Sequence, residues 1–111
     1  MLVARSSPFG GQTRTRVLLA LSLLFESYPR ELARVLEVPL SGVQKALQGL
    51  EGDGIASGRS VGRMRLYRIN PRYFAYSDLQ RYLLRLTEPE TELKRRVEAL
   101  RRRPRRTGKP L

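Results

Sequence analysis

The sequence predicts a small α+β domain that is mainly α-helical and carries one β-hairpin. Apolar residues at three- and four-residue spacing, Leu32, Ala33 and Leu36, mark one face of a short helix. Pro39 stops that helix, and a second apolar-periodic segment follows it. Residues 55–69 then read as two strands joined across Gly62. The expected order is therefore helix, turn, helix and hairpin.

The boundaries of the two helices follow from proline and glycine. Pro29 fits a first helical turn, where a missing N–H has no cost. Pro39 also pushes Val38 toward an extended conformation, so the chain turns between residues 36 and 40. The second helix runs to about residue 53. Gly54 suits a left-handed helix end, with Ile55 placed to pack back on the last turn.

The second helix has one apolar and one polar face. At about 100° per residue the buried face is formed by Val43, Ala46, Leu47 and Leu50. The opposite face is predicted to read DNA bases, because Gln and Lys can bond base edges and glycine allows close backbone approach. The predicted base-reading residues are Ser41, Gly42, Gln44, Lys45 and Gln48. The alternative is that these are ordinary solvated residues.

The hairpin supports the DNA-binding interpretation. Ile55–Ser60 and Met64–Ile69 are expected to pair across residues 61–63, with Tyr67 and Ile69 capping the core. Arginines near the hairpin tip suit a DNA backbone or minor groove, and none has an acidic neighbour in sequence. These arginines are Arg59, Arg63 and Arg65. A helix-turn-helix followed by such a hairpin is a winged helix-turn-helix, although a merely solvated basic hairpin is the alternative.

The first helix, near Thr13 to Phe25, is apolar on two sides, with Leu19 and Leu23 on the second side. Because a small domain has difficulty burying both sides, we expect the second to meet another subunit. The alternative is that C-terminal helices of the same chain cover it.

Two C-terminal helices are expected, at residues 78–86 and 88 to about 103, introduced by capping boxes at Ser77 and Thr87. A seven-residue leucine repeat suggests a zipper, but Pro89 interrupts it, so two short helices are favoured. Both arrangements support a homodimer. The residues predicted for its interface are Leu19, Leu23, Leu79, Leu83, Leu86, Leu93, Val97 and Leu100.

The composition indicates a polyanionic partner. The 111 residues allow one domain, and 22 Lys+Arg against 10 Asp+Glu give a net charge of +12. Nucleic acid is favoured over a membrane surface, since no basic amphipathic helix carries large aromatic anchors. With no Cys and no His, we expect no soft-metal site, no cofactor and no catalytic constellation. The longest uninterrupted apolar run, Val17–Leu21, is too short for a membrane span, so a cytoplasmic location is expected.

The expected organisation has four parts: a flexible arm at 1–12, a winged helix-turn-helix at 13–75, C-terminal helices at 76–103, and a disordered basic tail at 104–111. The tail and the end of the last helix are a candidate phosphate-tracking arm. The cations predicted to hold the DNA backbone there are Arg101, Arg102, Arg103, Arg105, Arg106 and Lys109. The alternative is a tail that only adds solubility and nonspecific attraction.

Residues 9–86 resemble the ArsR-like superfamily of bacterial and archaeal winged-helix regulators. The segments that carry the resemblance include Phe9–Gly10, Arg30–Ala33, Leu40–Gln44, Asp53–Ile55 and Tyr67–Pro71. The resemblance implies a homodimer on a palindromic operator, with the helix at 40–53 in the major groove. Glu37 departs from the family, which often has glycine there. Metal sensing by thiol or imidazole ligands does not carry over, because the chain lacks both residue types.

The predicted function is therefore that of a sequence-specific, dimeric, nucleoid-associated transcriptional regulator of double-stranded DNA, and not of an enzyme. The alternative is an architectural protein that binds nucleic acid without sequence preference, or an adaptor for a separate partner protein.

Overall fold

The computed structural model describes residues 9–102 and confirms the α+β class. The predicted arm and tail lie largely outside this range, at residues 1–8 and 103–111. The elements in chain order are α1 (Gln12–Leu24), β1 (Glu26–Ser27), α2 (Pro29–Leu36), α3 (Leu40–Gly52), β2 (Ala56–Val61), β3 (Met64–Ile69), α4 (Tyr76–Thr87) and α5 (Thr91–Arg102).

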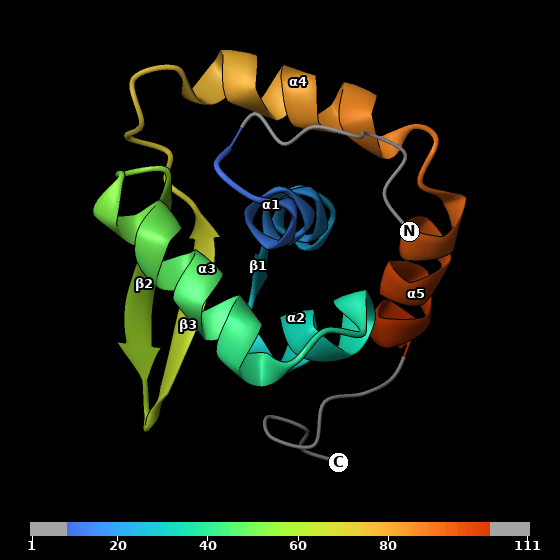
Figure 1. The fold of residues 1–111 in the computed structure, drawn as a ribbon, viewed down its shortest axis with the longest axis horizontal. Coiled ribbons are helices and arrows are strands. Elements are labelled where there is room, and N and C mark those ends of the chain that lie inside the picture. The colour runs from blue at the N-terminus through green and yellow to red at the C-terminus, as the bar shows by residue number, and fades with distance from the viewer. Residues whose placement is uncertain (1–8, 103–111) are drawn as a thin grey trace.

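Helix α1 is the centre of the molecule. Five consecutive residues, Val17 to Leu21, are each at most 1% exposed. Because successive helical side chains point about 100° apart, this run can be buried only if α1 is covered on every side. In Figure 1, α1 is seen end-on, with α4 above it, α3 and the hairpin on one side, α2 below and α5 on the other side. One core therefore joins all the helices.

Most residues of the predicted dimer interface are buried inside this single chain. Leu83 is fully buried, Leu19 is 1% exposed and Val97 is 3% exposed. Leu79 and Leu93 are also buried, and the remaining predicted residues, which pack partly buried against the core, are Leu23, Leu86 and Leu100. The expectation that a second subunit covers the five buried side chains is therefore wrong, whereas an interface role for Leu23, Leu86 and Leu100 stays a prediction. The alternative is confirmed, because α4 and α5 fold back over α1 and cover its second apolar side.

The C-terminal segment forms two short helices, as Pro89 indicates, and not one zipper helix. The predicted capping boxes are wrong. Ala75 occupies the N-cap of α4, so Ser77 already lies within the helix. Thr87 is the last residue of α4, and its hydroxyl donates to the Leu84 carbonyl at 2.7 Å.

The helix-turn-helix forms where the sequence predicts it. The chain leaves α2 through Glu37, which takes the left-handed conformation (φ 57°, ψ 48°) that glycine often supplies. At the end of α3, Gly54 has φ 78°. Its N–H donates to the Glu51 carbonyl at 3.0 Å, and the Ile55 N–H donates to the Leu50 carbonyl at 2.9 Å. These two bonds form a Schellman motif, which ends α3 at the predicted place.

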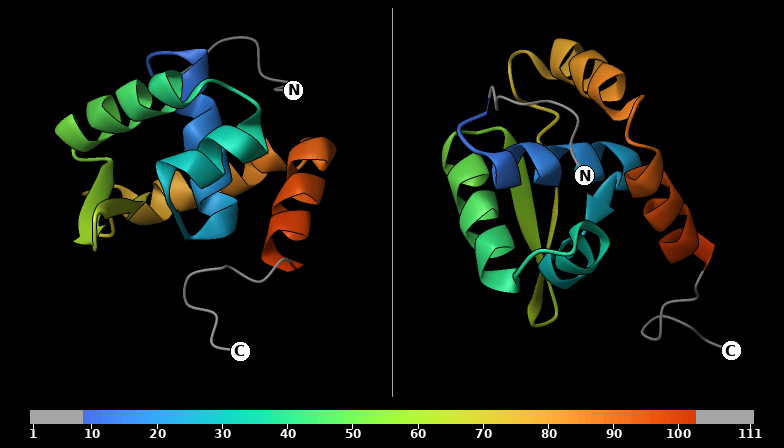
Figure 2. Two further views of the ribbon diagram at one scale, coloured as in Figure 1. Left: turned by 90° about the horizontal axis from the view of Figure 1, so that it is seen from below. Right: turned by 45° about the vertical axis from the view of Figure 1, so that its right-hand side comes forward.

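The hairpin joins a small antiparallel sheet with strand order β1-β3-β2. Val61 pairs with Met64, so the loop has two residues, and its first, Gly62, has φ 63°. Strand β1 was not predicted, because its two residues are too few to show an alternating pattern. It pairs Ser27 with Tyr67 and attaches the hairpin to the segment that follows α1. Figure 2 shows the hairpin projecting from the body of the molecule.

The burial of α4 against α1 can be tested with two neighbouring leucines, Leu83 and Leu84. Leu83→Ala should lower the free energy of unfolding by about 2–5 kcal/mol, because it leaves a cavity in the core. Leu84→Ala, at a residue 53% exposed, is the matched control and should have a much smaller effect. Urea unfolding of both variants measures this difference. A midpoint that rises with protein concentration would contradict the intrachain assignment.

Candidate nucleic-acid interface

A groove of about 440 Å³ lies between α3, the first turn of α2 and the hairpin. Its apolar lining includes Leu47 and Tyr67, which belong to the core. Its polar lining comes from three elements that the fold brings together: Arg30 of α2, Gln44 and Gln48 of α3, and Arg63 and Arg65 of the hairpin. Guanidinium and amide groups therefore line the groove beside buried apolar residues. These polar groups can bind the phosphates of an extended polyanion.

The two faces of α3 divide as predicted. Its four expected core residues are buried, and Leu47, Val43 and Leu50 are completely so. Among the residues predicted to read bases, the exposed ones are Ser41, Gln44, Lys45 and Gln48. Gly42 is half-buried, and a Cβ there would meet nothing within 4 Å. The fold itself therefore does not require glycine at this position.

The three hairpin arginines have different environments. Arg65 Nη2 lies 2.6 Å from Glu51 Oε2, and its guanidinium lies over the Tyr67 ring at 5.7 Å from the centroid. The hydrogen bond to Glu51 raises the pKa of Arg65. Arg59 Nη2 lies 3.6 Å from Glu26 Oε1. These acids come from α3 and β1, so they are spatial partners that the local sequence did not reveal.

Arg63, in the hairpin loop, is exposed and has no ion pair within residues 9–102. Among Arg59, Arg63 and Arg65, it is the one that has no carboxylate partner in the described part of the chain. Arg65 instead links the hairpin to the end of α3, because its ion pair joins β3 to Glu51.

Arg30 is a groove residue that the sequence reasoning missed. It is exposed, lies one residue after the start of α2 and lines the groove. A signal was available, because the positive end of a helix dipole disfavours a cation in the first turn.

The predicted C-terminal backbone contacts are only partly within the described chain. Arg101 donates from Nη2 to the Leu23 carbonyl at the end of α1, and Arg102 is exposed. The other four lie outside the described residues: Arg103, Arg105, Arg106 and Lys109. In Figure 1, α5 and the hairpin lie on opposite sides of α1, and both point toward the lower edge of the view.

Residues 9–102 carry neither a metal-binding cluster nor a membrane-spanning helix. No group of three or more His, Cys, Asp or Glu side chains there could hold a metal ion. No helix in this range is long and apolar enough to cross a membrane.

Comparison with known proteins supports the fold. No protein-family model and no curated protein sequence matches the chain. Among solved structures, the chain is similar to a cysteine-to-serine mutant of Lactococcus lactis ZitR, with a TM-score of 0.51 and 19% sequence identity. The match covers 91% of this chain and 81% of that chain. At this identity the likeness concerns the fold alone, and it supports the winged-helix architecture.

Gly58 tests how closely the hairpin arginine and the core are packed. A Cβ on Gly58 would lie 2.8 Å from Arg65 Nε and 2.9 Å from Tyr67 Cε2. We expect Gly58→Ala to destabilise the protein by about 1–3 kcal/mol, because the buried Tyr67 ring must move. Gly52→Ala is the control, since a Cβ there meets nothing within 4 Å. Thermal unfolding measures both, and equal stabilities would contradict this packing.

Proposed function

We propose that this protein is a sequence-specific regulator of transcription that binds double-stranded DNA. The observation that carries the proposal is the groove in which the polar face of α3 meets guanidinium groups from α2 and the hairpin. The net charge of +12 supports a polyanionic ligand. The winged-helix architecture, supported by the likeness to ZitR, is one in which a helix can enter the major groove.

In this proposal α3 lies in the major groove. Gln44 and Gln48 contact base edges from the groove side of α3, and Lys45 and Ser41 contact bases or phosphates next to them. Gly42 allows the start of α3 to approach the duplex closely. Arg63 and Arg30 hold the backbone on the two sides of the groove.

Homodimerisation on a palindromic operator, as in the ArsR-like superfamily that the sequence resembles, is also a proposal. Its interface has to lie outside the five predicted residues that are buried within one chain, and it can include the partly buried Leu23, Leu86 and Leu100. Large apolar side chains that remain exposed include Phe25, Phe74 and Leu84. A second subunit would have to dock without displacing α4 and α5 from α1.

The burial of the apolar sides of α4 and α5 within one chain favours a second candidate function. Since one chain completes its own core, a monomer could bind nucleic acid through charge alone, as an architectural protein or as an adaptor for another protein. The basic segment 103–111 would add to such binding by neutralising phosphates.

Selection of bound duplexes from a random DNA pool distinguishes the two functions. We would select at about 150 mM salt, where nonspecific phosphate binding is weakened. An enriched site establishes a sequence-specific regulator, and an inverted repeat with half-sites one helical turn apart indicates a dimer. Binding with no enriched motif would favour the architectural function.

Variants of α3 test base reading on the selected site. Gln48→Ala and Lys45→Ala should each lose about 1–3 kcal/mol of binding free energy on that site and little on random duplex. The reason is that a base contact contributes only when the matching base is present. Fluorescence anisotropy measures both affinities. Equal losses on the two duplexes would mean that these side chains contact phosphate.

Arg63 tests the hairpin through salt dependence. Removing one phosphate contact should reduce the slope of log affinity against log salt by about 0.9. We expect this change for Arg63→Ala on both the selected site and random duplex. Arg81→Ala is the control, since Arg81 pairs with Asp78 on the exposed side of α4. An unchanged slope for Arg63→Ala would place the hairpin tip away from DNA.

A further inference from the structure

The turn that leads into α3 is strained. Glu37 adopts φ 57° and ψ 48°, a left-handed conformation that disfavours residues with a Cβ. The Val38 N–H donates to the Ala33 carbonyl at 3.2 Å, and Pro39 forms the N-cap of α3. Because so few residues connect the helices, the conformation of Glu37 sets the direction in which α3 leaves α2. Contacts from elsewhere in the fold must offset its cost.

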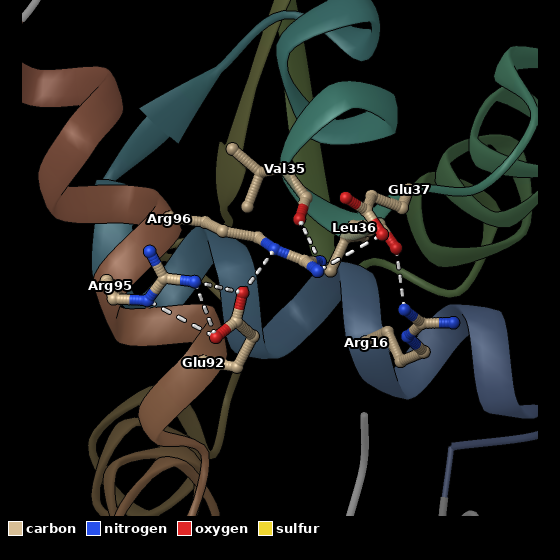
Figure 3. A network of polar contacts seen from close by, with 7 residues as sticks. All are labelled: Arg16, Val35, Leu36, Glu37, Glu92, Arg95 and Arg96. Atoms are coloured by element: carbon tan, nitrogen blue, oxygen red, sulfur yellow. Dashed lines mark hydrogen bonds and ion pairs between the residues drawn. The ribbon is translucent and has the colours of Figure 1, made fainter.

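Two arginines from distant elements supply such contacts (Figure 3). The last carbonyls of a helix have no partners within it, and they carry its negative dipole end. Arg16 of α1 donates from Nη2 to the Leu36 carbonyl at 2.6 Å. Arg96 of α5 donates from Nη1 to the Val35 carbonyl at 3.2 Å. The end of α2 is therefore held from two sides, once by the central helix and once by the C-terminal helix.

Arg96 also binds the strained residue directly. Its Nη2 lies 3.1 Å from Glu37 Oε1, and its Nε donates to Glu92 Oε2 at 3.1 Å. All three guanidinium nitrogens thus have acceptors, and the side chain is only 28% exposed. Lysine has no planar fork and could not reproduce this arrangement.

Glu92 fixes the orientation of the Arg96 guanidinium group. It accepts hydrogen bonds from Arg95 as well as Arg96, and the bond from Arg95 lowers the pKa of Glu92. A glutamate is ionised at neutral pH with or without this bond, so Glu92 accepts from Arg96 whether or not Arg95 is present. The Arg95 side chain itself is 75% exposed, and it donates to Glu92 within its own helix.

We propose that Arg96 is a positioning residue for DNA recognition, which holds the left-handed turn at Glu37 and so couples α5 to the orientation of α3. It lies outside the groove and touches none of the residues assigned to base or phosphate contact. Its influence passes through Val35 and Glu37 to the first two turns of α3, where Ser41 and Gln44 are placed. An event that moves α5 would therefore alter base reading without touching DNA. The consequence for DNA rests on the proposed function, whereas the effect on the turn does not.

Hydrogen exchange tests the effect on the turn without DNA. In Arg96→Ala the Val38 amide should exchange about tenfold faster, the factor expected for losing a charge-assisted hydrogen bond, while amides of α1 keep their protection. Arg95→Ala, the matched control, should leave Val38 unchanged. Adding Glu37→Gly to Arg96→Ala should restore much of the protection, because glycine adopts the left-handed conformation without strain. If Arg96→Ala does not fold, Arg96→Lys against Arg95→Lys makes the same comparison.

Unchanged exchange of Val38 in the Arg96 variants, or equal effects of the Arg95 and Arg96 variants, would overturn the proposal. DNA binding then tests the consequence. Arg96→Ala should weaken binding to the selected site by about tenfold and leave binding to random duplex unchanged, and Glu37→Gly should reduce the loss. Faster exchange of the Val38 amide together with unchanged affinity for the selected site would overturn the proposed coupling of α5 to DNA binding. Failure of the wild-type chain to select any duplex would instead contradict the proposed function and leave the exchange result valid.

Discussion

Complete burial of α1 is the constraint on which the rest of the structure depends. Five consecutive buried residues need partners all around the helix, and the sheet, α2, α3, α4 and α5 provide them. Burial of α1 determines where the groove lies, because α3 and the hairpin pack against α1 with their apolar sides inward. It also explains why the apolar side of the C-terminal helices is not free for a partner. Their leucines are needed to exclude water from the second side of α1.

The many arginines of this chain serve different purposes, and their charge alone does not distinguish them. Arg65 and Arg59 attach the hairpin to the body through Glu51 and Glu26. Arg16 and Arg96 hold the end of α2. Arg63 and Arg30 remain at the groove without an ion pair among residues 9–102. A net charge of +12 therefore overstates the number of cations that are available to a polyanion.

The winged-helix architecture leaves the orientation of α3 dependent on a short, strained turn. A glycine at position 37 would adopt the left-handed conformation at little cost. Glutamate costs more there, but its carboxylate gives the turn a partner on α5. The same residue that makes the turn less favourable locally thus connects it to the C-terminal helix. Through this contact α5 is linked to the turn that leads into α3.

The sequence by itself determined the elements whose signals are local. The order of helices and strands, the break at Pro39, the helix end at Gly54 and the hairpin loop at Gly62 all follow from backbone preferences and apolar spacing. The two faces of α3 also follow, since a helical period assigns Val43 and Gln48 to opposite sides. These features depend on residues close together in the chain.

Only the tertiary structure decided which partner each face and each charge would meet. Leu83 and Val97 could have packed against a second subunit, and their spacing is the same in either case. The ion pairs of Arg65 with Glu51 and of Arg96 with Glu37 join residues far apart in sequence, so no local pattern indicates them. The reason is that periodicity shows which side of a helix avoids water, whereas the path of the whole chain determines what covers that side.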